Sequence, residues 1–280
     1  MNVPIVGDLQ ELRRLTTKWH RAGETIGVVP TMGALHDGHL SLVKHAAKDC
    51  ERVIVTLFVN PKQFNNPEDL ANYPRTEHED AAKLAPFNID VLYVPSVETM
   101  YPDRFSTTVS VNGLTDMLCG EHRPGHFDGV ATVVSKLLMQ TSADRAYFGE
   151  KDYQQLQVVS RMARDLNLPT EIVGCPTIRE RDGLAMSSRN ARLTAEGRAK
   201  APALHAALQE LAVGLSRGGT MADLAPAVRR KITDAGFSEL EYLDLRAADG
   251  LELLNAETEP ARLFVAAWID GVRLIDNFPV

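Results

Sequence analysis

Short apolar runs alternate with helical patterns along the first two-thirds of this 280-residue chain. Runs of strand length lie at residues 25–29, 52–59, 91–94, 145–148 and 171–175, and residues 107–111 alternate like an edge strand. Stretches with helical periodicity lie between them at 38–49, 77–84, 129–140 and 153–166. Strands that alternate with helices form a mostly parallel sheet with helices on both faces. The sequence therefore predicts an α/β fold with a doubly wound parallel sheet.

The pattern changes after about residue 190. Helical stretches at 198–215 and 221–235 come first, and strand-like runs follow at 240–245, 262–269 and 272–276. This part is long enough to form a domain of its own. We therefore predict two domains, residues 1–178 with the parallel sheet and residues 179–280 as a smaller α+β domain.

Composition indicates the cell compartment and the classes of partner that suit this chain. The formal net charge of −7 gives no support to a nucleic-acid-binding surface. Three widely spaced cysteines suit a reducing compartment, and residues 1–9 lack the basic and apolar segments of a signal peptide. The apolar run at 263–269 is far too short to cross a membrane. We expect a cytoplasmic protein with neither a nucleic-acid nor a membrane partner.

The segment between the first predicted strand and its helix carries two histidines, in the sequence VVPTMGALHDGH at residues 28–39. Pro30 is predicted to end the strand, so that His36 and His39 lie at the N-terminus of the helix. Unpaired backbone N–H groups and the helix dipole favour phosphate there. Histidines at positions i and i+3 can donate to the same anion. This arrangement predicts a grip on a nucleotide triphosphate and indicates an enzyme that uses ATP.

Two other interpretations of the histidine pair stay open. The pair could bind a metal ion, although no third Cys, His or acidic residue stands nearby at a typical zinc spacing. The two residues could also be ordinary polar groups at a helix start. The chain has no G-x-G-x-x-G after a strand and no G-x-x-x-x-G-K-[ST], so neither common phosphate-binding loop is supported.

Polar residues in two further loops could bind a small molecule. Asn60 and Gln63 follow the second predicted strand, and their amides can donate and accept hydrogen bonds to hydroxyl or carboxylate groups. A polar turn around Pro61 is the alternative. Arg123, in the loop before the helix at 129–140, is either a clamp for carboxylate or phosphate or a solvated arginine.

The loop after the strand at 145–148 offers a phosphate-binding set. Gly149 allows close backbone approach, and Lys151 can reach phosphate oxygens as a point charge. Asp152 suits an N-cap or a hydrogen bond to ribose. Gln155, one turn further on, would project toward the same crevice. A capped helix with solvated charges would explain the same residues.

A serine-rich segment, LAMSSRN at residues 184–190, lies at the predicted domain junction. Its hydroxyls, backbone N–H groups and Arg189 would form a mobile second clamp on a triphosphate. By itself the segment could equally be a linker. Because the polar segments each follow a strand or lie at this junction, we expect them to share one site.

Together these segments resemble the pantothenate synthetase (pantoate–β-alanine ligase) family. The shared motifs occur in order: PTMGALHxGH at 30–39, FVNPxQF at 58–64, RPGHFxGV at 123–130, FGEKD at 148–152 and SSRN at 187–190. The resemblance covers residues 30–192 and continues more weakly beyond. The HxGH motif alone indicates only the wider nucleotidyltransferase superfamily with its HIGH and KMSKS signatures. Residues 186–189 resemble KMSKS, but Ala185 stands where that signature begins with lysine.

The resemblance implies a fold, a reaction and an assembly. The fold would be a Rossmann-like sheet with a C-terminal lid domain. The reaction would be the ATP-dependent ligation of (R)-pantoate and β-alanine to pantothenate, in the coenzyme A pathway. It would proceed through pantoyl adenylate with Mg²⁺ and release AMP and pyrophosphate. Family members are typically cytoplasmic homodimers.

The resemblance also implies roles for individual residues. His39 would be the proton donor and Lys151 would bind the β- and γ-phosphates, with His36, Ser187, Ser188 and Arg189 completing the catalytic set. Gln63 and Gln155 would hold pantoate, Gln63 would also lie near β-alanine, and Asn60 and Arg123 are further substrate-site candidates. Mg²⁺ would bridge phosphate oxygens, with no protein ligand assigned. The ATP cradle would comprise Met32, Gly33, Ala34, Leu35, His36, Asp37, Gly38, His39, Gly149, Glu150, Lys151, Asp152, Ile178, Met186, Ser187, Ser188 and Arg189.

Three other functions remain as alternatives. A different adenylyl- or nucleotidyltransferase would stop after one transfer and ignore β-alanine. A tRNA synthetase fits less well, because the chain is short and acidic and has no evident anticodon-reading domain. A non-catalytic module that senses ATP would bind the nucleotide without releasing pyrophosphate.

Overall fold

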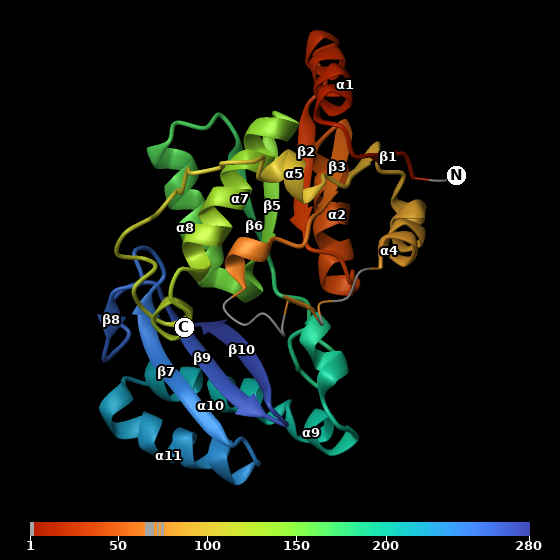
Figure 1. The fold of residues 1–280 in the computed structure, drawn as a ribbon. Helices are drawn as coiled ribbons and strands as arrows, with labels where there is room; N and C mark the ends of the chain where they lie inside the picture. The colour runs from red at the N-terminus through yellow and green to blue at the C-terminus, as the bar shows by residue number, and fades with distance from the viewer. Residues whose placement is uncertain (1–2, 65–69, 72, 74–75) are drawn as a thin grey trace. The chain divides into compact units, whose positions relative to one another are not determined.

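The computed structural model describes residues 3–64, 70–71, 73 and 76–280 (Figure 1). The chain divides into two compact units. Unit 1 comprises Met1–Glu150 and Gln155–Pro176, and unit 2 comprises Lys151–Gln154 and Thr177–Val280. The chain therefore enters unit 2 twice, first for four residues and then for its C-terminal part.

Unit 1 is built on a six-stranded sheet in the order β1-β4-β3-β2-β5-β6, in which every pairing is parallel. This confirms the predicted α/β sheet. The strands are β1 (Ile5–Val6), β2 (Ile26–Thr31), β3 (Arg52–Leu57), β4 (Val91–Tyr93), β5 (Arg145–Gly149) and β6 (Glu171–Cys175). The longer helices are α1 (Leu9–Arg21), α2 (Asp37–Asp49), α4 (Glu77–Leu84), α7 (His126–Thr141) and α8 (Tyr153–Asp165).

Helices cover both faces of this sheet. Neighbouring residues of a strand point to opposite faces, and β4 shows where each face leads. Leu92 packs in a buried cluster with Leu42 and Val43 of α2. The next residue, Tyr93, points the other way, and its hydroxyl donates to Oε1 of Gln140 on α7 at 3.0 Å. The sheet is therefore doubly wound.

The strand order reverses between β2 and β5, and such a reversal is where ligands bind in open α/β sheets, beyond the carboxyl ends of the strands. The segment containing His36 and His39 follows β2. Gly149 is the last residue of β5, and Glu150 follows it directly. The fold thus brings two of the predicted binding segments to the same end of two adjacent strands.

The prediction that Pro30 ends its strand is wrong, because β2 continues to Thr31. Backbone groups of a parallel strand point alternately to its two neighbours. The carbonyls of Thr25 and Thr31 accept from the β3 side, whereas that of Ile26 accepts from Asp144 on the β5 side. Pro30 lies four residues after Ile26, so its backbone groups point to the same side, toward β5. The pairing of β2 with β5 covers Gly27 and Val28. The missing N–H of Pro30 therefore lies beyond the described pairing of β2 with β5.

Two other element predictions are corrected. Residues 107–111 form no strand, because the Val109 N–H donates to Oγ1 of Thr132 on α7 at 2.9 Å instead of joining a ladder. The helix predicted at 198–215 is two helices, α9 (Ala195–Lys200) and α10 (Ala203–Ser216). Pro202 separates them at the N-cap of α10, since proline cannot supply the N–H that a continuous helix needs.

Unit 2 contains an antiparallel sheet in the order β10-β9-β7-β8. Its strands are β7 (Glu239–Ala247), β8 (Leu253–Leu254), β9 (Ala261–Ile269) and β10 (Val272–Pro279). Helix α10 packs on β9 and β10, and α11 (Met221–Asp234) packs on β7. Alternate residues of β9 from Leu263 to Ile269 enter the core beneath the helices. This confirms the smaller α+β domain. In the described part of the chain, no helix is both long and apolar enough to span a membrane.

Candidate active site

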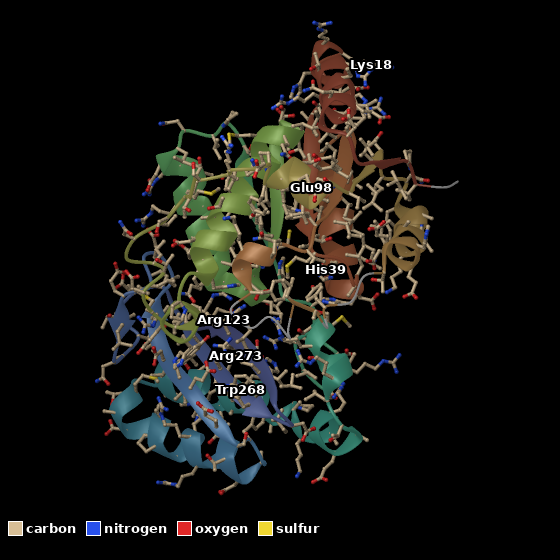
Figure 2. All side chains as sticks on the ribbon, viewed as in Figure 1. Lys18, His39, Glu98, Arg123, Trp268 and Arg273 are labelled. Atoms are coloured by element: carbon tan, nitrogen blue, oxygen red, sulfur yellow. The ribbon has the colours of Figure 1, made fainter. Side chains whose placement is uncertain are left out.

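The two histidines of unit 1 lie at the first turn of α2, where Figure 2 labels His39. Nδ1 of His36 accepts from the Gly38 N–H at 3.2 Å, and Nδ1 of His39 accepts from the His36 N–H at 3.4 Å. The ring centroids are 4.1 Å apart. A neutral histidine that accepts at Nδ1 carries its proton on Nε2. Both rings are therefore set as Nε2–H donors at a helix N-terminus.

A buried carboxylate holds the turn before these histidines. Asp80 of α4 is fully buried, and its two oxygens accept from the N–H groups of Ala34 and Leu35 at 2.9 and 2.8 Å. Thr76 donates its hydroxyl to the same carboxylate at 2.9 Å. Ala34 has a left-handed φ of 52°, a strained conformation for alanine. Asp80 therefore stabilises the backbone that delivers the histidine pair to the end of β2.

The predicted substrate residues Asn60 and Gln63 are in direct contact. Asn60, which is buried, donates through Nδ2 to Oε1 of Gln63 and to the Gly129 carbonyl, both at 3.0 Å. Its Oδ1 accepts from the Tyr101 hydroxyl at 2.7 Å and from the Lys62 N–H. Burial raises the pKa of Tyr101, which keeps this hydroxyl protonated. Asn60 therefore fixes the rotation of the Gln63 amide.

Arg123, which Figure 2 labels, contacts Gln63. It donates to the Gln63 carbonyl at 3.3 Å and lies 3.2 Å from Nε2 of His126. Nδ1 of His126 is 2.8 Å from that carbonyl, so Nδ1 carries the proton and Nε2 accepts from Arg123. The structure thus joins Asn60, Gln63 and Arg123 in one network, and adds His126 to it.

Gly149 ends β5 beside the point where the strand order reverses. A Cβ built on this glycine meets no atom of the described residues within 4 Å, so a ligand has room to approach its backbone there. Gln155 is half-buried on α8 and also belongs to unit 1.

The other predicted phosphate-binding residues belong to unit 2, namely Lys151, Asp152, Ile178, Met186, Ser187, Ser188 and Arg189. Nζ of Lys151 lies 3.7 Å from the Asp152 carboxylate. Ser187 caps the short helix at Ser188–Arg192, because its hydroxyl accepts from the Arg189 N–H at 3.2 Å. Asn190 donates to the Ala185 carbonyl at 3.0 Å. Its Oδ1 is buried without a hydrogen-bond partner among the described residues, which suits a donor from a ligand.

Sequence motifs did not reveal Asp80 or His126. Asp80 lies 46 residues from Ala34 in the chain, inside an ordinary amphipathic helix. His126 belongs to the RPGHF motif, so its position was visible, but its contact with Gln63 depends on a separation of 63 residues. Among residues 3–64, 70–71, 73 and 76–280, no group of three or more His, Cys, Asp or Glu side chains is arranged to hold a metal ion.

Known proteins resemble this chain over its whole length. The sequence model of the family described as pantoate-beta-alanine ligase matches residues 4–279. The pantothenate synthetase of Ruegeria pomeroyi is 63% identical over 280 residues, which are 100% of this chain and 98% of that protein. The pantothenate synthetase of Roseobacter denitrificans is 61% identical, with coverage of 100% and 99%.

Solved structures agree in fold. A crystal structure of pantothenate synthetase from Thermus thermophilus gives a TM-score of 0.93 at 44% identity and covers 99% of both chains. The pantoate-beta-alanine ligase from Francisella tularensis, solved with beta-gamma ATP and beta-alanine, gives a TM-score of 0.83 at 37% identity. It covers 99% of this chain and 97% of that one.

Proposed function

Because this chain belongs to the pantoate–β-alanine ligase family, we propose that it joins (R)-pantoate to β-alanine at the expense of ATP. The observation in the structure that carries this proposal is the histidine pair, which presents two oriented Nε2–H donors at a helix N-terminus. Such a site favours phosphate. In an ATP-dependent ligase of pantothenate biosynthesis, this phosphate is part of ATP.

The reaction has two steps. An oxygen of the pantoate carboxylate attacks the α-phosphorus of ATP, and the bond from that phosphorus to the bridging oxygen breaks, which releases pyrophosphate. The amine of β-alanine then attacks the carbonyl carbon of the acyl adenylate, loses a proton, and expels AMP. No protein nucleophile takes part. The protein contributes position and neutralisation of developing charge.

His36 and His39 donate from Nε2 to phosphate oxygens as negative charge develops on them. Both rings take their orientation from hydrogen bonds at Nδ1, so little reorganisation is needed when the transition state forms. Of the two, His39 is the one to which the resemblance to the family assigns the role of proton donor. Asp80 acts through the backbone N–H groups of Ala34 and Leu35 as a positioning residue.

Lys151 and Arg189 supply positive charge to the triphosphate, with hydroxyls of Ser187 and Ser188 as further donors. Ala185 cannot take the place of a lysine here, so these two cations carry the charge. Mg²⁺ enters bound to ATP as part of the substrate. The proposed donors are cationic or neutral rather than a cluster of carboxylates, which fits an ion held mainly by phosphate oxygens.

Gln63 and Gln155 hold pantoate. Because Oε1 of Gln63 accepts from Asn60, the NH₂ end of its amide is the end that would donate to a carboxylate or hydroxyl. Asn60, Arg123 and His126 fix this residue in place. The remaining proposals are that the enzyme works in the cytoplasm and forms a homodimer, as is typical of the family.

Pyrophosphate release from Mg-ATP tests the reaction. With pantoate alone we expect about one equivalent per active site, because the adenylate stays bound and shielded from water. Addition of β-alanine should convert this burst into continuous turnover. Release that ignores β-alanine would indicate an adenylyltransferase that stops after one transfer. ATP binding without any release would indicate a non-catalytic sensor.

A further inference from the structure

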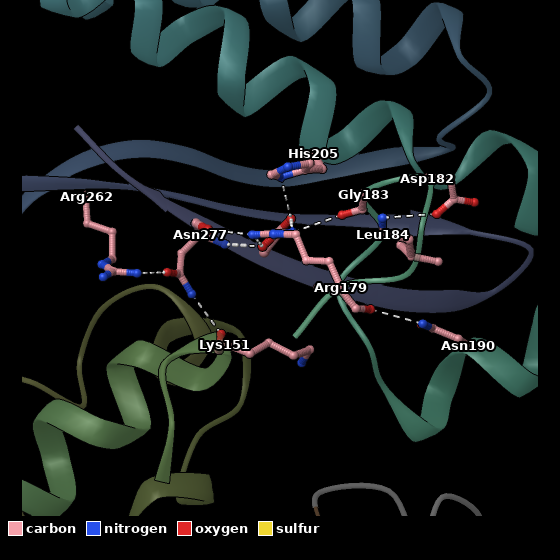
Figure 3. Close-up of polar contacts among 11 residues, drawn as sticks. Lys151, Arg179, Asp182, Gly183, Leu184, Asn190, His205, Arg262 and Asn277 are labelled. Carbon is pink, nitrogen blue, oxygen red and sulfur yellow. Dashed lines mark hydrogen bonds and ion pairs between the residues drawn. The ribbon is translucent and has the colours of Figure 1, made fainter. Parts of the chain in front are cut away.

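Two consecutive residues of the last strand, Asp276 and Asn277 of β10, contact the two segments of unit 2 that carry the proposed phosphate-binding residues. Figure 3 labels Asn277 together with Lys151 and Arg179 of these segments. One segment contains Lys151 and the other runs from Arg179 to Asn190. Side chains of neighbouring strand residues point to opposite faces of a sheet. Asp276 faces His205 of α10, whereas Asn277 faces Arg262 of β9.

Arg179 ties the second segment to Asp276. Its guanidinium donates to both carboxylate oxygens at 2.6 and 2.9 Å, and it also donates to the carbonyls of Gly183 and Asn277. The carboxylate accepts a further bond from the Asn277 N–H at 2.8 Å. The Asp276 side chain is almost fully buried, and a buried bidentate pair restricts both partners to one geometry.

This pair anchors a hairpin at residues 178–186, which overlaps the start of the serine-rich segment at residues 184–190. The Glu180 N–H donates to the Leu184 carbonyl at 2.8 Å, and the Met186 N–H donates to the Ile178 carbonyl at 3.0 Å. The turn contains Gly183 at φ 93°, packed so closely on His205 that a Cβ would lie 2.8 Å from its ring. The chain leaves the hairpin at Met186, one residue before Ser187.

Asn277 holds the first segment from the other face. Its Nδ2 donates to the Lys151 carbonyl at 2.8 Å, while its Oδ1 accepts from Arg262. The Arg262 guanidinium lies 4.1 Å from the ring centroid of Tyr153. The Tyr153 hydroxyl donates to the Ala248 carbonyl at 3.2 Å. These contacts explain why Lys151–Gln154 belong to unit 2 although the chain before and after them belongs to unit 1.

We propose that Asp276, Arg179 and Asn277 are positioning residues that hold Lys151 and the Ser187–Arg189 segment in a fixed arrangement for the ATP phosphates. The proposal rests on the phosphate-binding role proposed above for these segments. Phosphate binding must order the many rotamers of lysine and arginine side chains. If their backbones are already anchored, binding has no backbone entropy to overcome as well. None of the three residues needs to touch the nucleotide for this effect.

The test compares ATP binding with pantoate use in full-length variants. Arg179→Lys keeps the charge but loses the bidentate geometry, and Asn277→Asp keeps the size but replaces the donor to Lys151 by an acceptor. We expect each variant to weaken binding of α,β-methylene-ATP with Mg²⁺ by about tenfold in calorimetry. The KM for ATP should rise in parallel, while the KM for pantoate should change by less than about twofold.

Arg273→Lys provides the matched control. Arg273 forms a similarly buried pair with both oxygens of Glu241 on the same sheet, and its described contacts, with Glu241 and Tyr242, involve neither segment. We expect this variant to lose comparable thermal stability but to keep the parent affinity for the ATP analogue. If all three variants bind it alike, or if pantoate KM rises as much as ATP KM, the proposed positioning role is wrong.

Two further variants separate this proposal from the one on which it rests. Lys151→Ala and Arg189→Ala remove the proposed phosphate ligands themselves, and each should weaken analogue binding. If neither has an effect, the assignment of the two cations fails and the positioning role fails with it. If both weaken binding but Arg179→Lys and Asn277→Asp do not, only the positioning role is overturned.

Discussion

At the scale of single residues, His36 and His39 take their tautomer from the backbone around them. Each Nδ1 accepts from an N–H group at the start of α2, which leaves the ring proton on Nε2 in the neutral form. The same contacts form a capping box that satisfies N–H groups of the first turn. One pair of rings therefore serves the helix and the proposed phosphate site together.

His39→Ala should slow adenylate formation by about a hundredfold, since one preorganised donor to the transition state is lost. Pyrophosphate release in a single turnover with pantoate and ATP measures this step. His45→Ala, at an exposed position on the same helix, is the control and should keep the parent rate. A parent-like rate in His39→Ala would remove this residue from the mechanism, provided that circular dichroism shows an intact fold.

Site residues that lie in short motifs could be proposed from the sequence, and those joined to them only by the fold could not. The histidine pair, Gln63 and Lys151 all lie in such motifs, and their roles remain proposals. Asp80 and Asn277 lie in an ordinary helix and strand, and they meet the motifs only because distant elements pack together. Positioning residues of this kind carry no local signal, because their partners are backbone groups of any sequence.

At the scale of elements, proline does not by itself end a strand or a helix. β2 runs through Pro30, and α11 runs through Pro226. Periodicity predicted most of the long strands and helices, but α1 (Leu9–Arg21) was not predicted, and proline was a less reliable signal of where an element ends. The strand predicted at residues 107–111 does not form. The Val109 N–H donates to a side-chain oxygen, Oγ1 of Thr132, instead of to a neighbouring strand.

Pro226→Ala should raise the free energy of unfolding by about 1–3 kcal/mol, because an exposed interior helix position regains an N–H donor and a better helix former. Pro202→Ala is the matched control, since Pro202 stands at an N-cap where its missing N–H costs little. Thermal unfolding by calorimetry measures both. A gain in Pro202→Ala as large as that in Pro226→Ala would contradict the explanation.

At the scale of the whole molecule, one buried carboxylate links stability to pH. Burial raises the pKa of Asp276, but the neighbouring His205 ring and the hydrogen-bonded Arg179 guanidinium outweigh it, so the pKa in the folded chain is lowered. A carboxyl group whose pKa is lowered by folding stabilises the folded state at pH values above its pKa in the unfolded chain, which is about 3.9. This stabilisation is lost as the pH falls through the pKa of the folded chain.

Asp276→Asn should therefore lower the free energy of unfolding by roughly 3 kcal/mol at neutral pH, because Arg179 loses its buried partner. The difference from the parent should shrink as the pH falls below about 4. Urea unfolding in a Trp19→Phe background measures this, since Trp268 on β9 then reports unit 2 alone. Glu196→Gln, which breaks an exposed pair with Lys200, should change stability by less than about 1 kcal/mol. A pH-independent difference for Asp276→Asn would contradict this linkage.

The four residues Lys151–Gln154 fold with a sheet that begins more than eighty residues later in the chain. A chimaera spliced at 176/177 would therefore place the lysine of one parent against the β10 strand of the other. Transplanting unit 2 between relatives needs two inserts, the tetrapeptide and the C-terminal part. Recombination at a single point therefore cannot exchange unit 2 without also exchanging part of unit 1.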